Sequence, residues 1–360
     1  MTRVCIVTGG AGFIGCAISA GLAAKFDRVI AVDMLHPQVH ALPRRPAALA
    51  AGVELIHADI TYPDTWNALL ASATPDTVVH LAAETGTGQS LTESARHTHT
   101  NVTGTAVMLD AFVRGGVAPR RIVLSSSRAV YGEGAWRADT DGHITYPGAR
   151  TPGQLSAAQW DFTGLTAMPS EASVTRPAPV SVYGATKLAQ EHVLTAWAGA
   201  YGVELAILRL QNVYGPGQSL TNAYTGIVTL FCRLARSGQS IPLYEDGRII
   251  RDFVLINDVA DALLAAIDLD VAIPVAVDIG TGRASSIAEL AQTIAAHYNA
   301  PSPHVCGRFR LGDVRYAACK VQAADVLLGW SARTNIAEGL VKLAEWIESH
   351  SELLRNHSIA

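Results

Sequence analysis

A glycine-rich turn near the N-terminus constrains the fold more than any other feature of this 360-residue chain. Gly9, Gly12 and Gly15 recur every third residue, directly after the apolar run 4–7 and before a helical pattern over residues 17–25. Glycine lets the backbone turn tightly and approach a pyrophosphate, whose charge meets the free N–H groups at the start of the helix. The turn therefore predicts a strand–turn–helix unit that binds a dinucleotide.

The rest of the first half alternates short β-rich runs with longer helical patterns. Such alternation is typical of a parallel sheet that helices cover on both faces, so the chain is predicted to be α/β, with a doubly wound parallel Rossmann sheet. The strand candidates after the first are residues 28–32, 53–56, 77–80, 121–124 and 205–208, and helices are expected over 101–113 and 187–201.

Beyond Tyr214 the alternation weakens, and turns rich in Gly, Pro and polar residues become frequent. We predict a cofactor-binding domain over residues 1–214 and a smaller C-terminal α/β lobe over 215–360 that binds the substrate. A strand candidate at 276–279 could return the stretch 257–282 to the first sheet, so that the lobes interleave. The aperiodic stretch 137–180 is predicted to be an insertion, either a lid or a loop packed on the surface.

Composition limits the possible partners. The formal charge is −4 without a run of Lys or Arg, which argues against nucleic acid. No apolar run reaches the roughly 20 residues that cross a bilayer, so no membrane partner is expected. The N-terminus enters a strand without a secretory pattern, and the cysteines form no CxxC pair, which predicts a cytoplasmic protein with buried thiols and no metal. The five cysteines are Cys5, Cys16, Cys232, Cys306 and Cys319.

Two acidic residues bear on the choice of cofactor. Asp33 ends the second strand candidate, where a carboxylate accepts hydrogen bonds from both adenosine ribose hydroxyls and repels a 2′-phosphate. This position favours NAD over NADP. Asp59 follows the third strand candidate and could meet the adenine edge or cap a helix before Tyr62 and Pro63.

Tyr183 and Lys187 stand four residues apart, so they would share one face of a helix. A nearby ammonium and a cationic nicotinamide both stabilise a phenolate, which lowers the pKa of a tyrosine from about 10 toward that of a general base. A pair at this spacing is usually a surface pair, but its position after a dinucleotide turn favours a catalytic role.

Together these patterns resemble the extended short-chain dehydrogenase/reductase family, in its NAD-dependent sugar epimerase/dehydratase branch. The resemblance covers most of the chain, and its strength lies in the joint order of the motifs. The matching segments are residues 8–15, 79–83, 101–105, 125–127 with 130–132, the pair Tyr183 and Lys187, and 251–253.

The resemblance implies a role for each matching residue. Tyr183 would exchange the proton of the sugar C4 hydroxyl, Lys187 would hold the nicotinamide ribose, and Ser127 would hydrogen-bond the reacting hydroxyl unless it only caps the end of its strand. The implied cofactor contacts, beside Tyr183 and Lys187, are Gly9, Gly12, Phe13, Ile14, Gly15, Asp33, Asp59, Ile60, Leu81, Ala82, Ala83 and Ser125.

The expected substrate is a nucleotide-diphosphate sugar. The loop 84–90 follows the fourth strand candidate, where α/β folds place ligand contacts. Arginine suits the diphosphate because a guanidinium donates two parallel hydrogen bonds. The candidate substrate-binding residues are Thr85, Thr87, Gln89, Ser127, Asn212, Arg251 and Arg310.

The resemblance also bears on the reaction. Dehydratases of this branch carry an Asp-Glu pair where this chain has Arg128 and Ala129. Without those carboxylates the expected reaction is C4 epimerisation, in which one NAD takes a hydride and returns it to the opposite face. Glu84 could still supply a carboxylate, so a 4,6-dehydratase or a 4-ketoreductase stays the alternative, and a non-catalytic NAD-binding sensor is the remote one.

The loops 84–90, 127–134 and 210–220 look like those of members acting on deoxythymidine-diphosphate 6-deoxysugars such as rhamnose, with a UDP-hexose as the competing substrate. The resemblance further implies a homodimer, formed by two helices of each subunit, one of which carries Tyr183.

Overall fold

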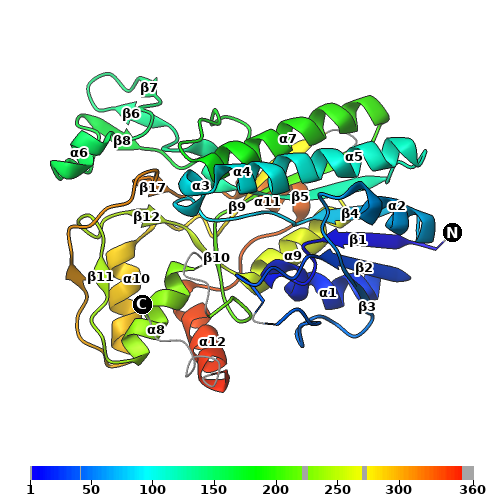
Figure 1. Cartoon of the computed structure of the whole chain (residues 1–360). Helices are drawn as coiled ribbons and strands as arrows, with labels where there is room; N and C mark the ends of the chain where they lie inside the picture. Colours follow the sequence, from blue (N-terminus) through cyan, green and yellow to red (C-terminus); the bar gives the residue numbers. More distant parts are fainter. Residues whose placement is uncertain (1, 41, 221–225, 270–273, 351–360) are drawn as a thin grey trace.

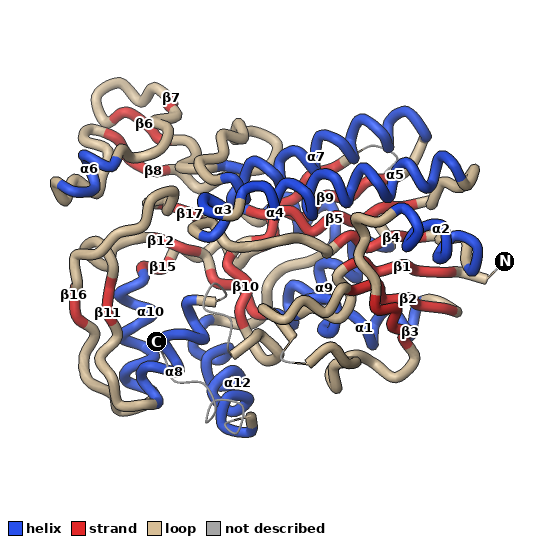
Figure 2. Tube along the Cα trace, in the orientation of Figure 1, coloured by secondary structure: helices blue, strands red, loops and turns tan. Residues whose placement is uncertain are grey.

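The computed structural model describes residues 2–40, 42–220, 226–269 and 274–350. A parallel seven-stranded sheet forms its centre, which confirms the predicted fold class (Figures 1 and 2). In the order β14-β9-β5-β4-β1-β2-β3, the strands are β14 (Val275–Ile279), β9 (Glu204–Leu210), β5 (Arg121–Ser127), β4 (Thr77–His80), β1 (Val4–Thr8), β2 (Arg28–Asp33) and β3 (Val53–His57).

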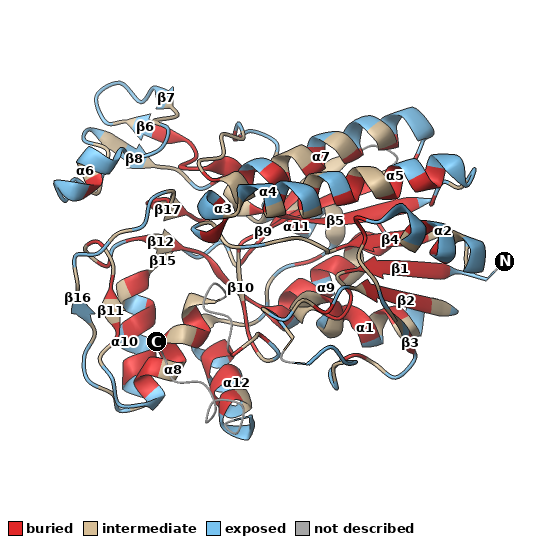
Figure 3. Cartoon of the chain, in the orientation of Figure 1, coloured by how far each residue is buried: buried red, intermediate tan, exposed pale blue. Residues whose placement is uncertain are grey.

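Helices cover both faces of the sheet, as a doubly wound fold requires. One face packs against α1 (Phe13–Lys25) and α9 (Ile256–Ile267), and the other against α2 (Pro63–Ser72), α5 (Gly104–Arg114) and α7 (Val182–Tyr201) (Figure 1). Strands β1 and β4 are buried along their whole length, whereas the helices that cover the sheet expose their outer faces (Figure 3). Continuous apolar runs therefore form the central strands.

The second lobe has a core of its own. Helices α8 (Ile227–Arg236), α10 (Ile287–His297) and α12 (Ile336–Ser349) contribute to it, and short strands lie beside them (Figure 1). These strands are β11 (Pro242–Leu243), β12 (Ile250–Arg251), β15 (Ser285–Ser286), β16 (His304–Val305) and β17 (Tyr316–Ala317), and the pair β10 (Asn212–Tyr214) and β13 (Phe253–Leu255) lies next to α9.

After the lobe begins, the chain returns to the central sheet. Val277 of β14 pairs with Leu208 of β9, and α9 packs on α1. Helix α11 (Gln322–Leu328) then contacts β14. The first fold unit is thus completed by residues far downstream of Tyr214.

The stretch after Gly132 forms a small antiparallel sheet, with β6 (Trp136–Ala138) between β7 (Ile144–Thr145) and β8 (Leu165–Ala167). A short helix, α6 (Pro152–Ser156), lies beside it, and this unit stands apart from the central sheet (Figure 2). We call the residues 137–180 the insertion. It contains secondary structure that the aperiodic sequence did not reveal, because its strands are only two or three residues long.

Arg150 ties the insertion to the rest of the molecule. Its guanidinium donates from Nε to Glu133 at 3.2 Å, from one amino group to Glu245 at 2.8 Å, and from the other to the carbonyl oxygen of Asp313 at 2.9 Å. Glu245 also accepts from Arg315 at 3.2 Å. Since Arg150, Glu133 and Glu245 are almost fully buried, these ion pairs join the insertion, the first domain and the second lobe.

Within the described part of the chain, none of the helices is both long and apolar enough to cross a membrane. The same residues contain no cluster of His, Cys, Asp or Glu that could hold a metal ion. All five cysteines are free thiols; Cys5, Cys232 and Cys319 are buried, whereas Cys16 and Cys306 are partly exposed.

Candidate active site

The glycine turn lies where the carboxyl ends of β1 and β4 meet, at the point where the strand order reverses. Ligands of open α/β sheets bind in this crevice. Gly9 has φ +66°, and a Cβ atom there would lie 2.7 Å from the backbone nitrogen of Ala82. A Cβ atom on Gly15 would lie 2.5 Å from the carbonyl oxygen of Gly10. Only glycine fits these positions, which leaves a cradle shaped for a pyrophosphate.

Asp33 is fixed at the end of β2. Its Oδ2 accepts a hydrogen bond from the backbone N–H of Ala11 at 3.0 Å, and its Oδ1 accepts one from Leu35 at 2.8 Å. An ionised carboxylate has about four acceptor positions, so each oxygen can still accept a bond from a ribose hydroxyl. The cradle and this carboxylate fit NAD.

Asp59 forms a local turn. Its Oδ1 accepts from the N–H of Thr61 at 2.8 Å, the pattern of an Asx turn. The residue that caps α2 is Tyr62 rather than Asp59, so the helix-cap alternative is not what the structure shows. Ile60 is buried beside Gly104 in the core. The adenine contact of Asp59 stays a prediction.

Tyr183 and Ser127 meet across two elements. Ser181 caps α7 and starts the helix two residues before Tyr183, while Ser127 ends β5. The Ser127 hydroxyl accepts from the N–H of Ala129 at 3.1 Å and is also hydrogen-bonded to Tyr183. The two interpretations of Ser127, as a cap and as an active-site hydroxyl, are therefore compatible.

Opposing effects act on the pKa of Tyr183. Burial raises the pKa of its phenol, and the bond to Ser127 and the charge of Arg128 lower it. The sequence suggested Lys187 as the lowering charge, but the structure supplies Arg128, which follows Ser127 in the chain. In the cofactor-free protein the phenol is therefore neutral at ordinary pH.

Lys187 is buried one turn after Tyr183 and its Nζ donates to Oε1 of Gln190 at 2.5 Å. Burial lowers the pKa of Lys187 to about 7, and the nearby Glu191 opposes the shift. The side-chain nitrogen of Gln190 lies 3.2 Å from His80 Nε2, and His80 Nδ1 lies 2.7 Å from the Thr8 hydroxyl. A hydrogen-bonded chain thus connects the glycine turn with Lys187.

His80 in that chain is fully buried, and burial followed by the charge of Lys187 lowers its pKa to about 3. It is therefore a neutral imidazole at neutral pH. Sequence reasoning missed the contact between His80 and Gln190, the residue that accepts from Lys187, because contacts between residues 110 positions apart leave no local pattern.

A second buried chain holds α7 against the sheet. Glu191 of α7 accepts from Arg209 of β9 at 2.6 Å, and Arg209 donates to the Tyr131 hydroxyl at 3.0 Å. Tyr131 in turn donates to Asp278 of β14 at 2.8 Å. Burial raises the pKa of Asp278 to about 7, and Tyr131 and Arg209 oppose that shift. These bonds fix the helix that carries Tyr183 relative to two strands.

The loop 84–90 contains the first three predicted substrate contacts. Gln89 is buried and exchanges side-chain hydrogen bonds with Gln38, besides donating to Glu93 at 2.9 Å. Glu84 is ion-paired with Arg96 at 2.9 Å, so its carboxylate is already engaged and is a poor substitute for the missing dehydratase pair. Thr85 and Thr87 occupy the same loop, and Thr87 lies near Gly312 of the second lobe.

The predicted diphosphate residues separate into two groups. Asn212 accepts from Arg128 Nε at 2.8 Å, and Arg251 is buried with its guanidinium on Asp313 at 2.6 Å. Arg310, by contrast, is exposed and lies over the ring of Tyr244, with 4.9 Å between the guanidinium carbon and the ring centroid. The structure thus places Asn212 and Arg251 around Arg128, whereas Arg310 lies on the surface beside Tyr244.

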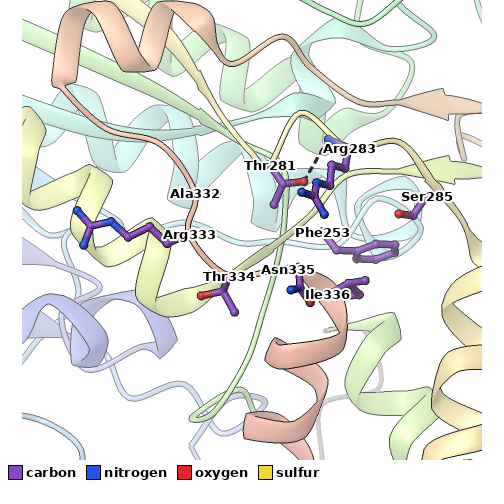
Figure 4. Close-up of a pocket in the computed structure, with 9 residues that line it drawn as sticks. All are labelled: Phe253, Thr281, Arg283, Ser285, Ala332, Arg333, Thr334, Asn335 and Ile336. Atoms are coloured by element: carbon purple, nitrogen blue, oxygen red, sulfur yellow. Dashed lines mark hydrogen bonds between the residues drawn. The ribbon is translucent and has the colours of Figure 1, made fainter.

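A separate pocket lies behind β13, between the turn after β14 and the start of α12 (Figure 4). Asp252 shapes it by accepting from the N–H and the hydroxyl of Thr281 at 2.8 and 2.7 Å. Arg283 reaches over the pocket, whereas Arg333 extends away from it (Figure 4). The predicted catalytic, cofactor-binding and substrate-binding residues do not line this pocket. The lining residues are Phe253, Thr281, Arg283, Ser285, Ala332, Arg333, Thr334, Asn335 and Ile336.

The fold and the site define a Rossmann-type enzyme with a cradle for NAD and a tyrosine next to a serine and a lysine. The model of the NAD dependent epimerase/dehydratase family matches residues 5–152 and 161–280. The chain belongs to this family and is an NAD-dependent enzyme.

Two curated relatives match over nearly their whole length. The dTDP-L-rhamnose 4-epimerase of Burkholderia thailandensis is 57% identical over 342 residues, covering 95% of this chain and 94% of the relative. The UDP-glucose 4-epimerase of Mycolicibacterium smegmatis is 30% identical, covering 96% and 99%.

Solved structures share the fold. A UDP-glucose 4-epimerase of Thermotoga maritima, crystallised with UDP-glucose, superposes with a TM-score of 0.78 at 27% identity and covers 97% of this chain and 100% of that chain. A UDP-glucose 4-epimerase of Thermus thermophilus in complex with NAD gives a TM-score of 0.75 at 26% identity, covering 96% and 99%.

Proposed function

We propose that this protein is an NAD-dependent nucleotide-sugar 4-epimerase whose substrate is dTDP-L-rhamnose. The single observation that carries the substrate is the 57% identity to the dTDP-L-rhamnose 4-epimerase of Burkholderia thailandensis over nearly the full length of both chains. The loops around Thr85, Ser127 and Asn212 resemble those of family members that act on deoxythymidine-diphosphate 6-deoxysugars, which is the same class of substrate. A UDP-hexose is the competing substrate, since other relatives act on UDP-glucose.

In the proposed mechanism Tyr183 is the acid–base residue. Its phenolate takes the proton of the C4 hydroxyl while Ser127 hydrogen-bonds the same oxygen. After the 4-keto sugar has rotated and presents its other face, Tyr183 returns the proton. Lys187, presented by Gln190, would hold the nicotinamide ribose and add positive charge beside the phenolate. NAD, when bound by the cradle at residues 9–15 and by Asp33, would accept the C4 hydride and give it back to the opposite face.

The structure supports epimerisation over dehydration. Arg128 and Ala129 stand at the positions of the dehydratase carboxylates, and Glu84 is paired with Arg96. Two carboxylates are near enough for their charges to affect the pKa of Arg128. Of these, Asp313 is paired with Arg251 and Glu133 with Arg150. Glu84, Asp313 and Glu133 therefore each have a cationic partner already.

The test uses dTDP-L-rhamnose that carries deuterium at C4, incubated with purified protein and no added cofactor. We expect the C4 epimer with the deuterium retained, because the abstracted hydride is returned to the same carbon. UDP-glucose and UDP-galactose serve as competing substrates. Loss of water from UDP-glucose or UDP-galactose, which carry the C6 hydroxyl that rhamnose lacks, would instead indicate a 4,6-dehydratase. Loss of the label from dTDP-L-rhamnose would contradict hydride return. Tyr183→Phe should abolish turnover yet still bind NAD.

We also propose a cytoplasmic homodimer. An exposed stripe along α7 supports the dimer, since Ala185, His192, Ala196 and Gly199 lie on one face of the helix that carries Tyr183. Mostly small side chains allow two helices to approach closely. The five free thiols are consistent with the cytoplasm.

A further inference from the structure

Arg128 has unused hydrogen-bonding capacity in the site. Its Nε donates to Oδ1 of Asn212 at 2.8 Å, whereas its two terminal nitrogens make no hydrogen bond to any residue that the structure describes. Because Nε–H can only donate, Asn212 must turn its oxygen toward Arg128 and its Nδ2 away. That Nδ2 likewise has no acceptor among the described residues. The pair therefore offers a fixed set of donors without an acceptor.

The charges around Arg128 favour an anion at this position. The charged or titratable groups that act on it are Arg251, Asp313, Tyr183 and Glu133. Both carboxylates are committed elsewhere: Asp313 accepts from Arg251 at 2.6 Å, and Glu133 accepts from the backbone N–H of Arg315 at 2.8 Å as well as from Arg150. Burial, followed by the charge of Arg251, lowers the pKa of Arg128 to about 9. An anion between the two guanidinium groups would relieve their repulsion.

The position of Arg128 in the site indicates which anion it meets. Ser127 and Tyr183 mark the reacting hydroxyl, and Arg128 is the next residue after Ser127. Arg128 is also close enough to Arg251, the predicted diphosphate residue, for the charge of Arg251 to act on it. In a nucleoside-diphosphate sugar, the anionic group nearest to the sugar ring is the β-phosphate, which is the phosphate bonded to the sugar.

We propose that Arg128, oriented by Asn212, binds the β-phosphate of the substrate and fixes the point about which the 4-keto sugar turns. The inference rests on the proposed function, since it takes the substrate to be a nucleoside-diphosphate sugar. A guanidinium can donate two parallel hydrogen bonds to one phosphate. An anchored β-phosphate lets the sugar rotate about the bonds that join it to the phosphate, while the keto group stays within reach of the returning hydride.

The experiment compares two nucleotides that differ by the phosphate in question. Calorimetric titration of the NAD-loaded protein with dTMP and dTDP measures how much the second phosphate contributes to binding. In Arg128→Gln we expect the affinity for dTDP to fall about 10- to 100-fold, the usual effect of a lost charge-assisted bond, with the affinity for dTMP nearly unchanged. Arg128→Lys should retain part of the preference, because it keeps the charge.

Arg283→Gln is the matched control. Arg283 is an exposed arginine of the separate pocket, and its loss should change neither affinity (Figure 4). Equal weakening of dTMP and dTDP in Arg128→Gln, or an unchanged preference for dTDP, would overturn the proposal. Far-ultraviolet circular dichroism and NAD content show whether each variant is folded.

A second readout follows the keto intermediate. If Arg128 anchors the β-phosphate, Arg128→Gln releases some 4-keto sugar before the hydride returns, and reduced cofactor accumulates on the enzyme during turnover, visible by its near-ultraviolet absorbance. Arg283→Gln should show no such accumulation. The nucleotide comparison needs no turnover, so a protein that fails to epimerise dTDP-L-rhamnose refutes the proposed function without deciding the role of Arg128.

Discussion

Tyr183 can act as a base only if other groups lower its pKa, because burial alone keeps its phenol protonated. At the residue scale two groups lower the pKa of the phenol: a hydrogen bond from Ser127 at the end of β5, and the positive charge of Arg128, the residue after it. Nicotinamide and the ammonium of Lys187 would add to this only when the cofactor is bound. The pKa of Tyr183 is therefore set by groups at the end of β5 and directly after it, joined by Lys187 of α7 when the cofactor is bound.

Ser127→Ala removes one of these lowering effects. We expect the pKa of Tyr183 to be higher in the variant than in the wild type, because the hydrogen bond from Ser127 that lowers it is lost. Since kcat/KM requires the phenolate, its acidic limb should move to higher pH. The pH profile of kcat/KM in wild type and variant measures this shift, and an unchanged limb together with a lower kcat would mean that Ser127 acts only on the substrate.

Lys187 makes the cofactor-free protein sensitive to pH. Its pKa is lowered from 10.5 to about 7, so between these values the folded protein binds fewer protons than the unfolded chain. The free energy of unfolding therefore contains a penalty that is complete below pH 7 and disappears as the pH rises toward 10.5. Lys187→Met lacks this penalty.

Urea titrations of cofactor-free wild type and Lys187→Met at several pH values test the sign. The free energy of unfolding of the variant minus that of the wild type should be largest near pH 7 and decline steadily toward pH 10.5. A difference that stays constant over this range would show that Lys187 is charged in the folded protein.

At the scale of elements, the two parts of the site differ in how far the sequence could predict them. The glycine turn and the pair Tyr183 and Lys187 are local patterns, and the strands of the central sheet were predicted in type and in their order along the chain. The ends of β2 and β5 were predicted too early, because their polar last residues, Asp33 and Ser127, interrupt the apolar run.

The remaining part of the site depends on contacts that are distant in sequence. His80 holds Gln190, the acceptor of Lys187, and Arg150 links three elements whose sequences share no motif. Such contacts appear only when the fold brings the strands and helices together.

Arg150→Met tests the link between the insertion and the other elements. The variant leaves Glu133 and Glu245 buried without their shared cation, although Arg315 still reaches Glu245. Removing one partner of a buried pair costs about 3–5 kcal/mol. We expect a loss of this size in the free energy of unfolding, with faster proteolysis within residues 137–180.

The control for this prediction is an exposed ion pair from the same insertion. Glu171 accepts from Lys320 at 3.0 Å, and Glu171→Gln should cost less than about 1 kcal/mol because solvent screens the pair. Equal costs in the two variants would contradict the importance assigned to the buried network.

At the scale of the whole molecule, the proposed dimer can be tested by a substitution on the exposed stripe of α7. Ala196→Arg places a long charged side chain on the exposed stripe of α7 and should give a monomer by light scattering after gel filtration. Ala71→Arg, on the exposed side of α2, is the matched substitution and should leave a dimer. If Ala196→Arg still forms a dimer, another surface must form the interface.

The return of β14 to the central sheet also has a consequence for biosynthesis. Until Val275–Ile279 has been translated, β9 has an open edge, and until α9 has been translated, one face of the sheet lacks a helix that packs on α1. A nascent chain that stops after Tyr214 therefore exposes apolar surface on the ribosome. The NAD-binding unit can be completed only after much of the second lobe has been synthesised, so the two lobes mature together rather than in succession.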